Sequence, residues 1–293
     1  MTRRTAAAWG WGVVGVVALV ALWEAYKWLG PADGLVLGGE DGLRVLPRTH
    51  DRAMPHVTDM IARLFDPTSG AATPPLWATV ASAGVLTLGI ALVGWVIGVV
   101  VGVGFALLMQ RWRIVERGLL PWIVVSQTVP LIAFAPLVAR IGSQIDRAGL
   151  PWPEWLSVAV IASYLAFFPV SIGALKGLSS PDAIHLDLMR SYAAGYGQTL
   201  RRLRFPAAVP YLIPAARLAA ANAVVGAIVA EVSIGMRGGL GRMLLQAAQS
   251  ASADPALPWG PIFGAVLLGL LVAGVVALLA TGLRRYRRGE ASA

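Results

Sequence analysis

The apolar residues of this 293-residue chain are gathered into long runs, and this segregation limits what the chain can fold into. Each run is close to the roughly 20 residues that an α-helix needs to cross a bilayer. Hydrophobic residues make up 57% of the chain and charged residues only 13%, with a mean hydropathy of +0.70. Soluble domains carry about 25% charged residues. The sequence therefore predicts an all-α integral membrane protein with one membrane domain.

Six transmembrane helices are expected, with basic residues at their ends. The expected spans cover residues 9–29, 76–109, 118–141, 154–178, 206–234 and 262–282. Arginines cluster at 3–4, 111–117, 201–204 and 284–288, which is the positive-inside pattern that sets orientation. Both termini are therefore expected in the cytoplasm. Because the basic residues follow the span ends, they indicate membrane orientation and not nucleic-acid binding.

The chain divides into four expected segments. Residues 1–30 form an N-terminal transmembrane anchor that stays uncleaved, 31–75 an extracytoplasmic loop, 76–283 the main transmembrane domain and 284–293 a basic cytoplasmic tail. Within the loop, Val57, Ile61, Leu64 and Phe65 recur at helical spacing. This pattern predicts a short amphipathic helix on the outer membrane surface. A loosely ordered loop is the alternative.

The chain lacks the residues that most enzymatic or cofactor-dependent functions would need. It has no cysteine, and its three histidines lie outside the apolar runs without ligand-like spacing, so no metal site is expected. It contains no phosphate-binding loop of the form G-x-x-x-x-G-K-[ST] and no nucleophile elbow. The chain is therefore not expected to be an enzyme or to hold a cofactor itself.

Glycine and proline mark two of the expected spans. Gly94, Gly98 and Gly102 stack on one face of the second span, as in helices that pack closely in lipid. The third span is interrupted by Pro121, Pro130 and Pro136, beside the polar residues 126–128. Those polar residues either line a pathway or form hydrogen bonds between helices.

Charge within the spans is sparse, which bears on the mechanism. Only Arg217 and Glu231 lie clearly inside a span, and both belong to the fifth. A charge at a span centre costs about 2.5–3.5 kcal/mol on insertion scales, so neither is expected to face lipid. An ion-coupled transporter usually carries more such groups.

A polar, arginine-rich block separates the fourth and fifth spans, and we call residues 182–205 the hook. Pro181 and Asp182 form a good start signal for a helix. Gly195 and Gly197 are expected to permit a sharp turn before the next span begins at Pro206. A compact helical hook that faces the cytosol can dock into a separate protein. The plainer reading is a basic loop that only fixes topology.

The hook resembles the signature of inner-membrane permease subunits of ABC importers, E-A-A-x3-G-x9-I-x-L-P. Aligned on Pro206, this chain supplies Asp187-Leu188-Met189, then Ala193 in place of glycine, then Leu203 and Phe205. The run from Pro206 to Arg217 and the V-A-E at 229–231 are similar to the branch that imports nitrate, taurine, alkanesulfonates and thiamine-pyrimidine precursors. The resemblance covers residues 76–283.

The resemblance implies a type I ABC importer permease fold in the bacterial inner membrane. The expected partners are ABC ATPase subunits, which would bind ATP and Mg, an external solute-binding protein and a second permease copy in a homodimer. The implied ATPase-coupling residues are Asp187, Arg190, Ser191, Tyr192, Ala193, Ala194, Gly195, Gly197 and Pro206. The expected path-lining residues are Gln127, Tyr164, Asn222 and Glu231.

Three other functions stay open at this point. An ion-coupled secondary transporter is disfavoured by the sparse intramembrane charge, and a membrane enzyme by the missing nucleophiles and metal ligands. A scaffold whose hook merely recruits a partner would share most of these features. The solute is expected to be a small organic molecule or oxyanion, with no ranking among sulfonate, nitrate and pyrimidine precursor. The segment at 126–137 resembles the sub-branch for organic solutes and slightly favours an organic molecule.

Overall fold

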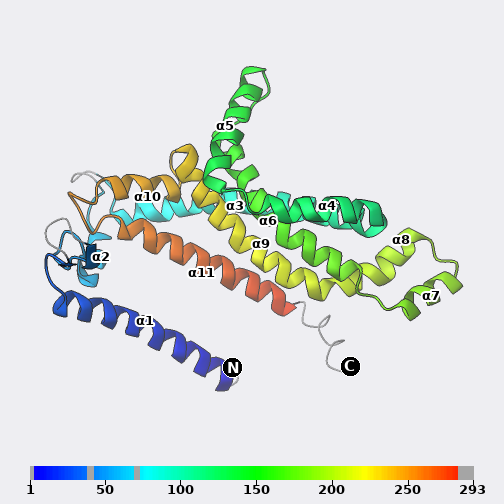
Figure 1. Cartoon of the computed structure of the whole chain (residues 1–293), viewed down its shortest axis with the longest axis horizontal. Coiled ribbons are helices and arrows are strands. Elements are labelled where there is room, and N and C mark those ends of the chain that lie inside the picture. The colour runs from blue at the N-terminus through cyan, green and yellow to red at the C-terminus, as the bar shows by residue number, and fades with distance from the viewer. Residues whose placement is uncertain (1–2, 38–42, 69–72, 283–293) are drawn as a thin grey trace. The chain divides into compact units, whose positions relative to one another are not determined.

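A computed structural model describes residues 3–37, 43–68 and 73–282 of the chain (Figure 1). The described chain is almost entirely helical, apart from a short antiparallel hairpin in the outer loop. The helices are α1 (Arg3–Leu29), α2 (Val57–Arg63), α3 (Leu76–Arg111), α4 (Arg113–Ser126), α5 (Leu131–Arg147), α6 (Glu154–Leu178), α7 (Ala183–Ser191), α8 (Tyr196–Thr199), a π-helical turn η1 (Leu200–Arg204), α9 (Phe205–Ile234), α10 (Leu240–Gln249) and α11 (Trp259–Gly282). The strands are β1 (Leu35–Leu37) and β2 (Leu43–Leu46).

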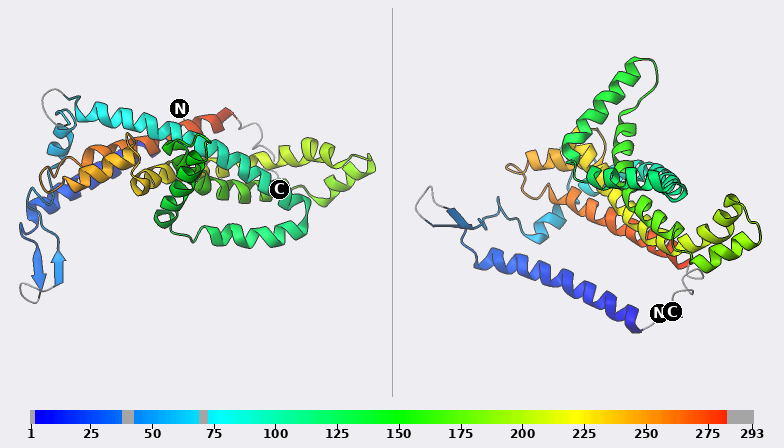
Figure 2. Two further views of the ribbon diagram at one scale, coloured as in Figure 1. Left: turned by 90° about the horizontal axis from the view of Figure 1, so that it is seen from above. Right: turned by 45° about the vertical axis from the view of Figure 1, so that its right-hand side comes forward.

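The predicted spans correspond to five helices that are long and apolar enough to cross a membrane, and to one bent pair. Helices α4 and α5 meet at an angle of 105° and complete a sixth span only if they are counted together (Figure 2). The predicted interruption of the third span is therefore confirmed at Pro130, where the chain bends sharply. Pro130 precedes α5 in an extended conformation. Because proline has no N–H and restricts the residue before it, it disfavours a helix that continues from α4 into α5. Pro121 and Pro136 lie inside α4 and α5 without ending them.

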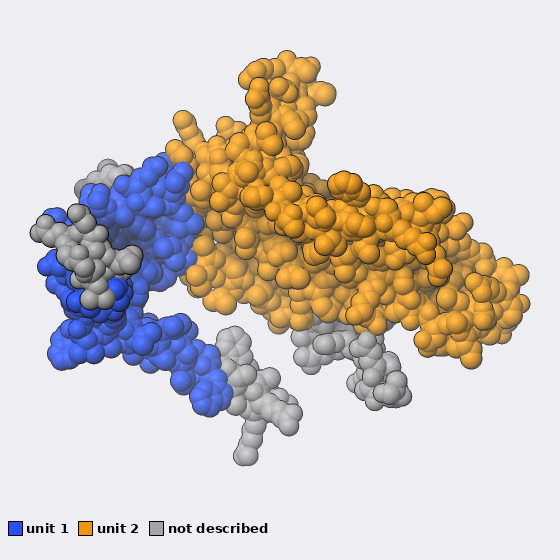
Figure 3. All heavy atoms as spheres, in the orientation of Figure 1, with its two compact units in different colours: residues 1–81, 244–263 blue, residues 82–243, 264–293 orange. Residues whose placement is uncertain are grey.

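The chain forms two compact units, which are coloured separately in Figure 3. The first unit comprises Met1–Ala81 and Leu244–Phe263, and the second comprises Ser82–Met243 and Gly264–Ala293. This grouping brings the outer loop together with a late segment of the chain. The four expected segment boundaries stay a prediction, and the basic tail at 284–293 lies outside the described residues.

In the first unit, the outer end of α1 holds the loop that follows it. Lys27 Nζ lies 2.7 Å from Asp51 Oδ1, and this hydrogen bond lowers the pKa of the exposed Asp51 carboxyl below its usual value. Glu24 Oε1 accepts the backbone N–H of Val57 at 2.8 Å, which satisfies one of the free donors at the start of α2. The predicted short helix therefore exists. Its Ile61 is 49% exposed, whereas Met60 is buried.

In the second unit, small residues let three helices pack closely. A Cβ on Gly94 would lie 2.6 Å from the Cβ of Ala162, and one on Gly98 would lie 2.6 Å from the Cβ of Ala166. The glycine stack on α3 therefore packs against α6, as the spacing predicts. On α9, a row of alanines (Ala215, Ala219, Ala223 and Ala227) is buried, and Gly173 of α6 meets Ala215. This packing leaves the opposite face of α9 exposed.

Candidate functional site

The hook is a helical hairpin that joins α6 to α9 (Figure 1). Its first arm, α7, begins directly after Asp182, as the start signal predicts. No residue of α7 is buried. Its apolar side chains Ile184 and Leu188 are 74% and 52% exposed, and Tyr192, which directly follows the helix, is 76% exposed. These three side chains recur every four residues and so lie on one face of the helix. An isolated protomer therefore presents an apolar row to its surroundings.

The turn of the hook is made by Ala193 and not by the two glycines that follow. Ala193 has a φ of 53° and is the only described non-glycine residue with a positive φ. Its N–H donates to the Arg190 carbonyl at 2.8 Å, and the N–H of Ala194 donates to the Met189 carbonyl at 3.0 Å. This pair of bonds is a Schellman motif, which normally has glycine at the left-handed position.

The expectation that Gly195 and Gly197 form the turn is therefore wrong. Gly195 has a φ of −67° and precedes α8, in which Gly197 takes an ordinary helical place. The position where the family signature has glycine is the one that needs a left-handed conformation. Ala193 adopts it at a cost, because its Cβ crowds the following carbonyl oxygen.

The second arm of the hook is fixed to the ends of neighbouring helices. The Tyr196 hydroxyl donates to Gln110 Oε1 at 2.8 Å, and the Arg111 guanidinium lies 4.9 Å from the centre of the Tyr196 ring. Arg204 Nη1 donates to the Leu178 carbonyl at the end of α6, at 2.7 Å. The sequence analysis missed these anchors, because Gln110 and Tyr196 are 86 positions apart. A movement of the hook would thus reach α3, α6 and α9 together.

Two of the expected path residues donate hydrogen bonds to backbone carbonyls of other helices. The Asn222 side-chain amide donates to the Leu165 carbonyl at 3.2 Å, and the Tyr164 hydroxyl donates to the Ser126 carbonyl. The Leu165 carbonyl lies four residues before Pro169 and so lacks its usual helical N–H donor. The Ser126 carbonyl lies at the end of α4 and also accepts the Val129 N–H at 3.3 Å. In a membrane such carbonyls are satisfied by neighbouring helices. This arrangement favours the hydrogen-bonding alternative for both side chains.

Gln127 follows α4 directly at the 105° break and is half-buried. Its amide nitrogen lies 3.4 Å from Ser126 Oγ, a long contact that leaves the amide oxygen available. Of the four expected path residues, Gln127 is thus the least engaged by the protein itself.

Glu231 is fully buried and joins three helices. Its Oε1 accepts the Thr87 hydroxyl of α3 at 2.8 Å, and its Oε2 accepts the Gly241 N–H of α10 at 2.8 Å. The Leu240 N–H donates to the same Thr87 oxygen at 3.0 Å. The carboxyl group therefore caps the N-terminus of α10, where negative charge is favourable. This geometry favours a structural role over path lining.

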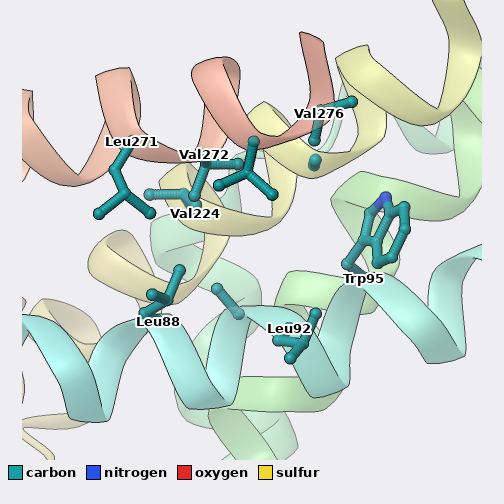
Figure 4. Close-up of a pocket in the computed structure, with 10 residues that line it drawn as sticks. Leu88, Leu92, Trp95, Val224, Leu271, Val272 and Val276 are labelled. Atoms are coloured by element: carbon teal, nitrogen blue, oxygen red, sulfur yellow. The ribbon is translucent and has the colours of Figure 1, made fainter. Parts of the chain in front are cut away.

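An apolar cavity of about 230 Å³ opens between α3, α9 and α11 (Figure 4). Leu88 and Leu92 line it from α3, Val224 from α9, and Leu271 and Val272 from α11. The indole N–H of Trp95, at its edge, is already bonded to the Ala216 carbonyl at 3.1 Å. The lining thus offers no free polar group to a charged solute. Within the described chain, no group of three or more His, Cys, Asp or Glu residues could hold a metal ion.

The chain is similar in sequence to known transport permeases. The chain is 33% identical over 209 residues to the formylaminopyrimidine transport permease protein ThiX of Halalkalibacterium halodurans, which covers 70% of this chain and 77% of that protein. It is 28% identical over 197 residues to the putative aliphatic sulfonates transport permease protein SsuC of Bacillus subtilis, covering 67% of each. Both relatives are named as transport permeases.

A solved structure supports the fold. The crystal structure of an amino acid ABC transporter with histidines matches with a TM-score of 0.55 and 20% identity, over 71% of this chain and 94% of the other. Residues 94–287, which include the hook and both helices it joins, match the family as a whole. The chain is a multi-pass ABC importer permease and belongs to the family of binding-protein-dependent transport system inner membrane components.

Proposed function

We propose that the chain forms the translocation path of an ATP-driven importer in a bacterial inner membrane, with both termini in the cytoplasm. Two copies would form the pore. Two ATPase subunits, which hold the ATP and Mg, would dock on the hooks, and an external binding protein would deliver a small organic solute or oxyanion. The named cargo of the relatives, formylaminopyrimidine and aliphatic sulfonates, supports this class of solute.

The observation that carries the proposal is the exposed apolar row on the hook. Ile184, Leu188 and Tyr192 stand on a helix that has no buried residue of its own. Exposing such a row to water is unfavourable by about 25 cal/mol per Å² of apolar surface, so a partner groove that covers it would gain that energy. The Asp187–Arg190 ion pair, at 2.8 Å, lies away from this row and keeps the other side of the helix polar.

The test is co-purification of the permease with the ABC ATPase of the same transport system, followed by a measurement of ATP hydrolysis. Tyr192→Asp or Ala194→Arg, each within or beside the row, is expected to reduce complex formation at least about tenfold, because a charge would be buried in an apolar groove. Ile114→Asp is the matched control, since Ile114 is 87% exposed but lies outside the hook. If both hook variants bind and stimulate the ATPase normally, the hook is not the docking site.

A further inference from the structure

Arg217 is a charged side chain in the middle of a membrane helix. It is the thirteenth residue of the 30-residue helix α9, about 18 Å along the helix from Phe205 at 1.5 Å per residue. The side chain is exposed on the protomer. Among the residues that the structure describes, no carboxylate lies within ion-pair distance of it. An arginine at this depth needs an anion or water.

Arg217 shares its face of α9 with small and apolar residues. Pro214, Leu218, Ala221 and Val225 are also exposed and lie within one stripe at helical spacing, opposite the buried alanine row. Pro214 and Ala221 lie one turn to either side of Arg217, and because their side chains are short they do not cover its guanidinium group. Because one face of α9 packs against α6, the stripe is the face left for a path or for the other copy.

Lipid is a poor environment for this side chain. A charge at a span centre is expensive on every scale, and such residues face a protein interior or a water-filled cavity. A long side chain near a helix end can reach the headgroups, but Arg217 has more than ten residues of α9 on either side.

A second copy of the chain offers no counter-ion at this depth either. The acidic residues of the membrane-spanning helices are few: Glu24 in α1, Glu116 in α4, Asp146 in α5, Glu154 in α6 and Glu231 in α9. Glu116, Asp146 and Glu154 lie within four residues of a helix end. Glu231 is fully buried against Thr87 and Gly241, and Glu24 holds His56 and Val57 at the outer end of α1. A homodimer would therefore bring together two copies of Arg217 and no free carboxylate in the middle of the spans.

We infer that Arg217 is a binding site for an anionic group of the transported solute, such as a sulfonate, phosphate, carboxylate or inorganic oxyanion. This inference rests on the proposed function and narrows its solute class to molecules that carry negative charge. A guanidinium presents a planar fork of N–H donors that matches two oxygens of such a group. Arg217 is the one exposed charged side chain of α9, so an anion in the path beside this helix can reach it.

The experiment measures anion binding by the full-length permease in nanodiscs of zwitterionic phosphatidylcholine, with and without the ATPase. The probes are methanesulfonate, nitrate and inorganic phosphate, and the neutral dimethyl sulfone is the uncharged counterpart. At least one anion is expected to bind, and dimethyl sulfone is not. Arg217→Gln is expected to weaken that anion about 10- to 100-fold, the loss typical of a hydrogen bond to a charged group. Arg217→Lys should retain part of the affinity, because it keeps the charge but loses the fork.

Arg237→Gln is the matched control, since Arg237 is exposed just beyond the end of α9 and should not affect binding. The inference would be overturned if no anion binds the wild type, or if Arg217→Gln binds the anion as tightly as the wild type does. It would also be overturned if Arg217→Gln changes binding only when phosphatidylglycerol is added, because that result would assign Arg217 to lipid phosphate. Loss of the dimer in Arg217→Gln with unchanged anion binding would also overturn it. If the ATPase does not bind the hook, the proposed function is refuted. The measurement of anion binding without the ATPase would still test the role of Arg217.

Discussion

Replacing Thr87 with valine should test the buried cluster that joins α3, α9 and α10. The substitution keeps the shape of the side chain and removes its hydroxyl. Two interactions end: the 2.8 Å bond to Glu231 Oε1 and the 3.0 Å bond from the Leu240 N–H. A hydrogen bond to a charged group contributes about 1.5–3 kcal/mol, and a buried N–H left without an acceptor costs about 1–3 kcal/mol. We therefore expect a loss of about 3 kcal/mol or more.

The size of this effect separates the cluster from ordinary hydrogen bonds in membranes. Side-chain hydrogen bonds between membrane helices average only about 0.6 kcal/mol in double-mutant cycles. Thr87 should exceed that value, because it serves a carboxyl group and a helix N-terminus at once, and both sites are closed to water. Gly239 and Gly241 pack directly on Glu231, so no space exists for a replacement donor.

The assay is reversible unfolding of the purified permease in mixed micelles with increasing denaturing detergent. Ser171→Ala is the control, because Ser171 is also fully buried but bonds only to the Phe167 carbonyl within its own helix. The control should cost about 0.5–1.5 kcal/mol. If Thr87→Val costs no more than Ser171→Ala, the cluster does not stabilise the junction and the assignment of Glu231 as a cap is wrong.

Two further predictions concern backbone conformation. Ala193→Gly should stabilise the hook by up to about 1 kcal/mol, because the cost of about 1–2 kcal/mol for a left-handed alanine exceeds the entropy cost of glycine. Amide hydrogen exchange across residues 189–194 should slow in Ala193→Gly and speed up in Ala193→Val. Equal exchange rates in the wild type and both variants would contradict the strain at Ala193. Asn222→Leu should destabilise the protein by about 1–3 kcal/mol, because the Leu165 carbonyl freed by Pro169 would lose its donor. The double variant Asn222→Leu, Pro169→Ala should recover much of that loss in the same unfolding assay. No recovery would mean that Asn222 does not serve the proline break.

The site was only partly predictable from the sequence. The hook was placed correctly by its polarity between two apolar runs and by its helix start signal. Its turn was assigned to Gly195 and Gly197, because glycine is the residue expected at a left-handed position. The Schellman bonds instead place that position at Ala193, which residue type alone does not reveal. Ile184 was missed, although its apolar spacing with Leu188 and Tyr192 carried the signal.

The polar residues of the spans show the same limit. Sequence position indicated that Gln127, Tyr164, Asn222 and Glu231 were unusual in apolar surroundings, but not what they bind. For Tyr164, Asn222 and Glu231 the partners lie on other helices, 57 positions away for Asn222 and 144 for Glu231. Only the folded chain shows that Asn222 serves the break at Pro169 and that Glu231 caps α10.

The sequence by itself determined the membrane class, the approximate span boundaries, the close packing of α3 and the position of the hook. These features depend on local composition and periodicity. A long apolar segment forms a helix in lipid, because all of its backbone hydrogen bonds must be made within the segment. Tertiary structure decided the 105° break between α4 and α5, the turn at Ala193 and the partner of each buried polar group. Those features depend on which distant residues meet, because a hydrogen bond in lipid is satisfied by whichever neighbouring helix the packing supplies.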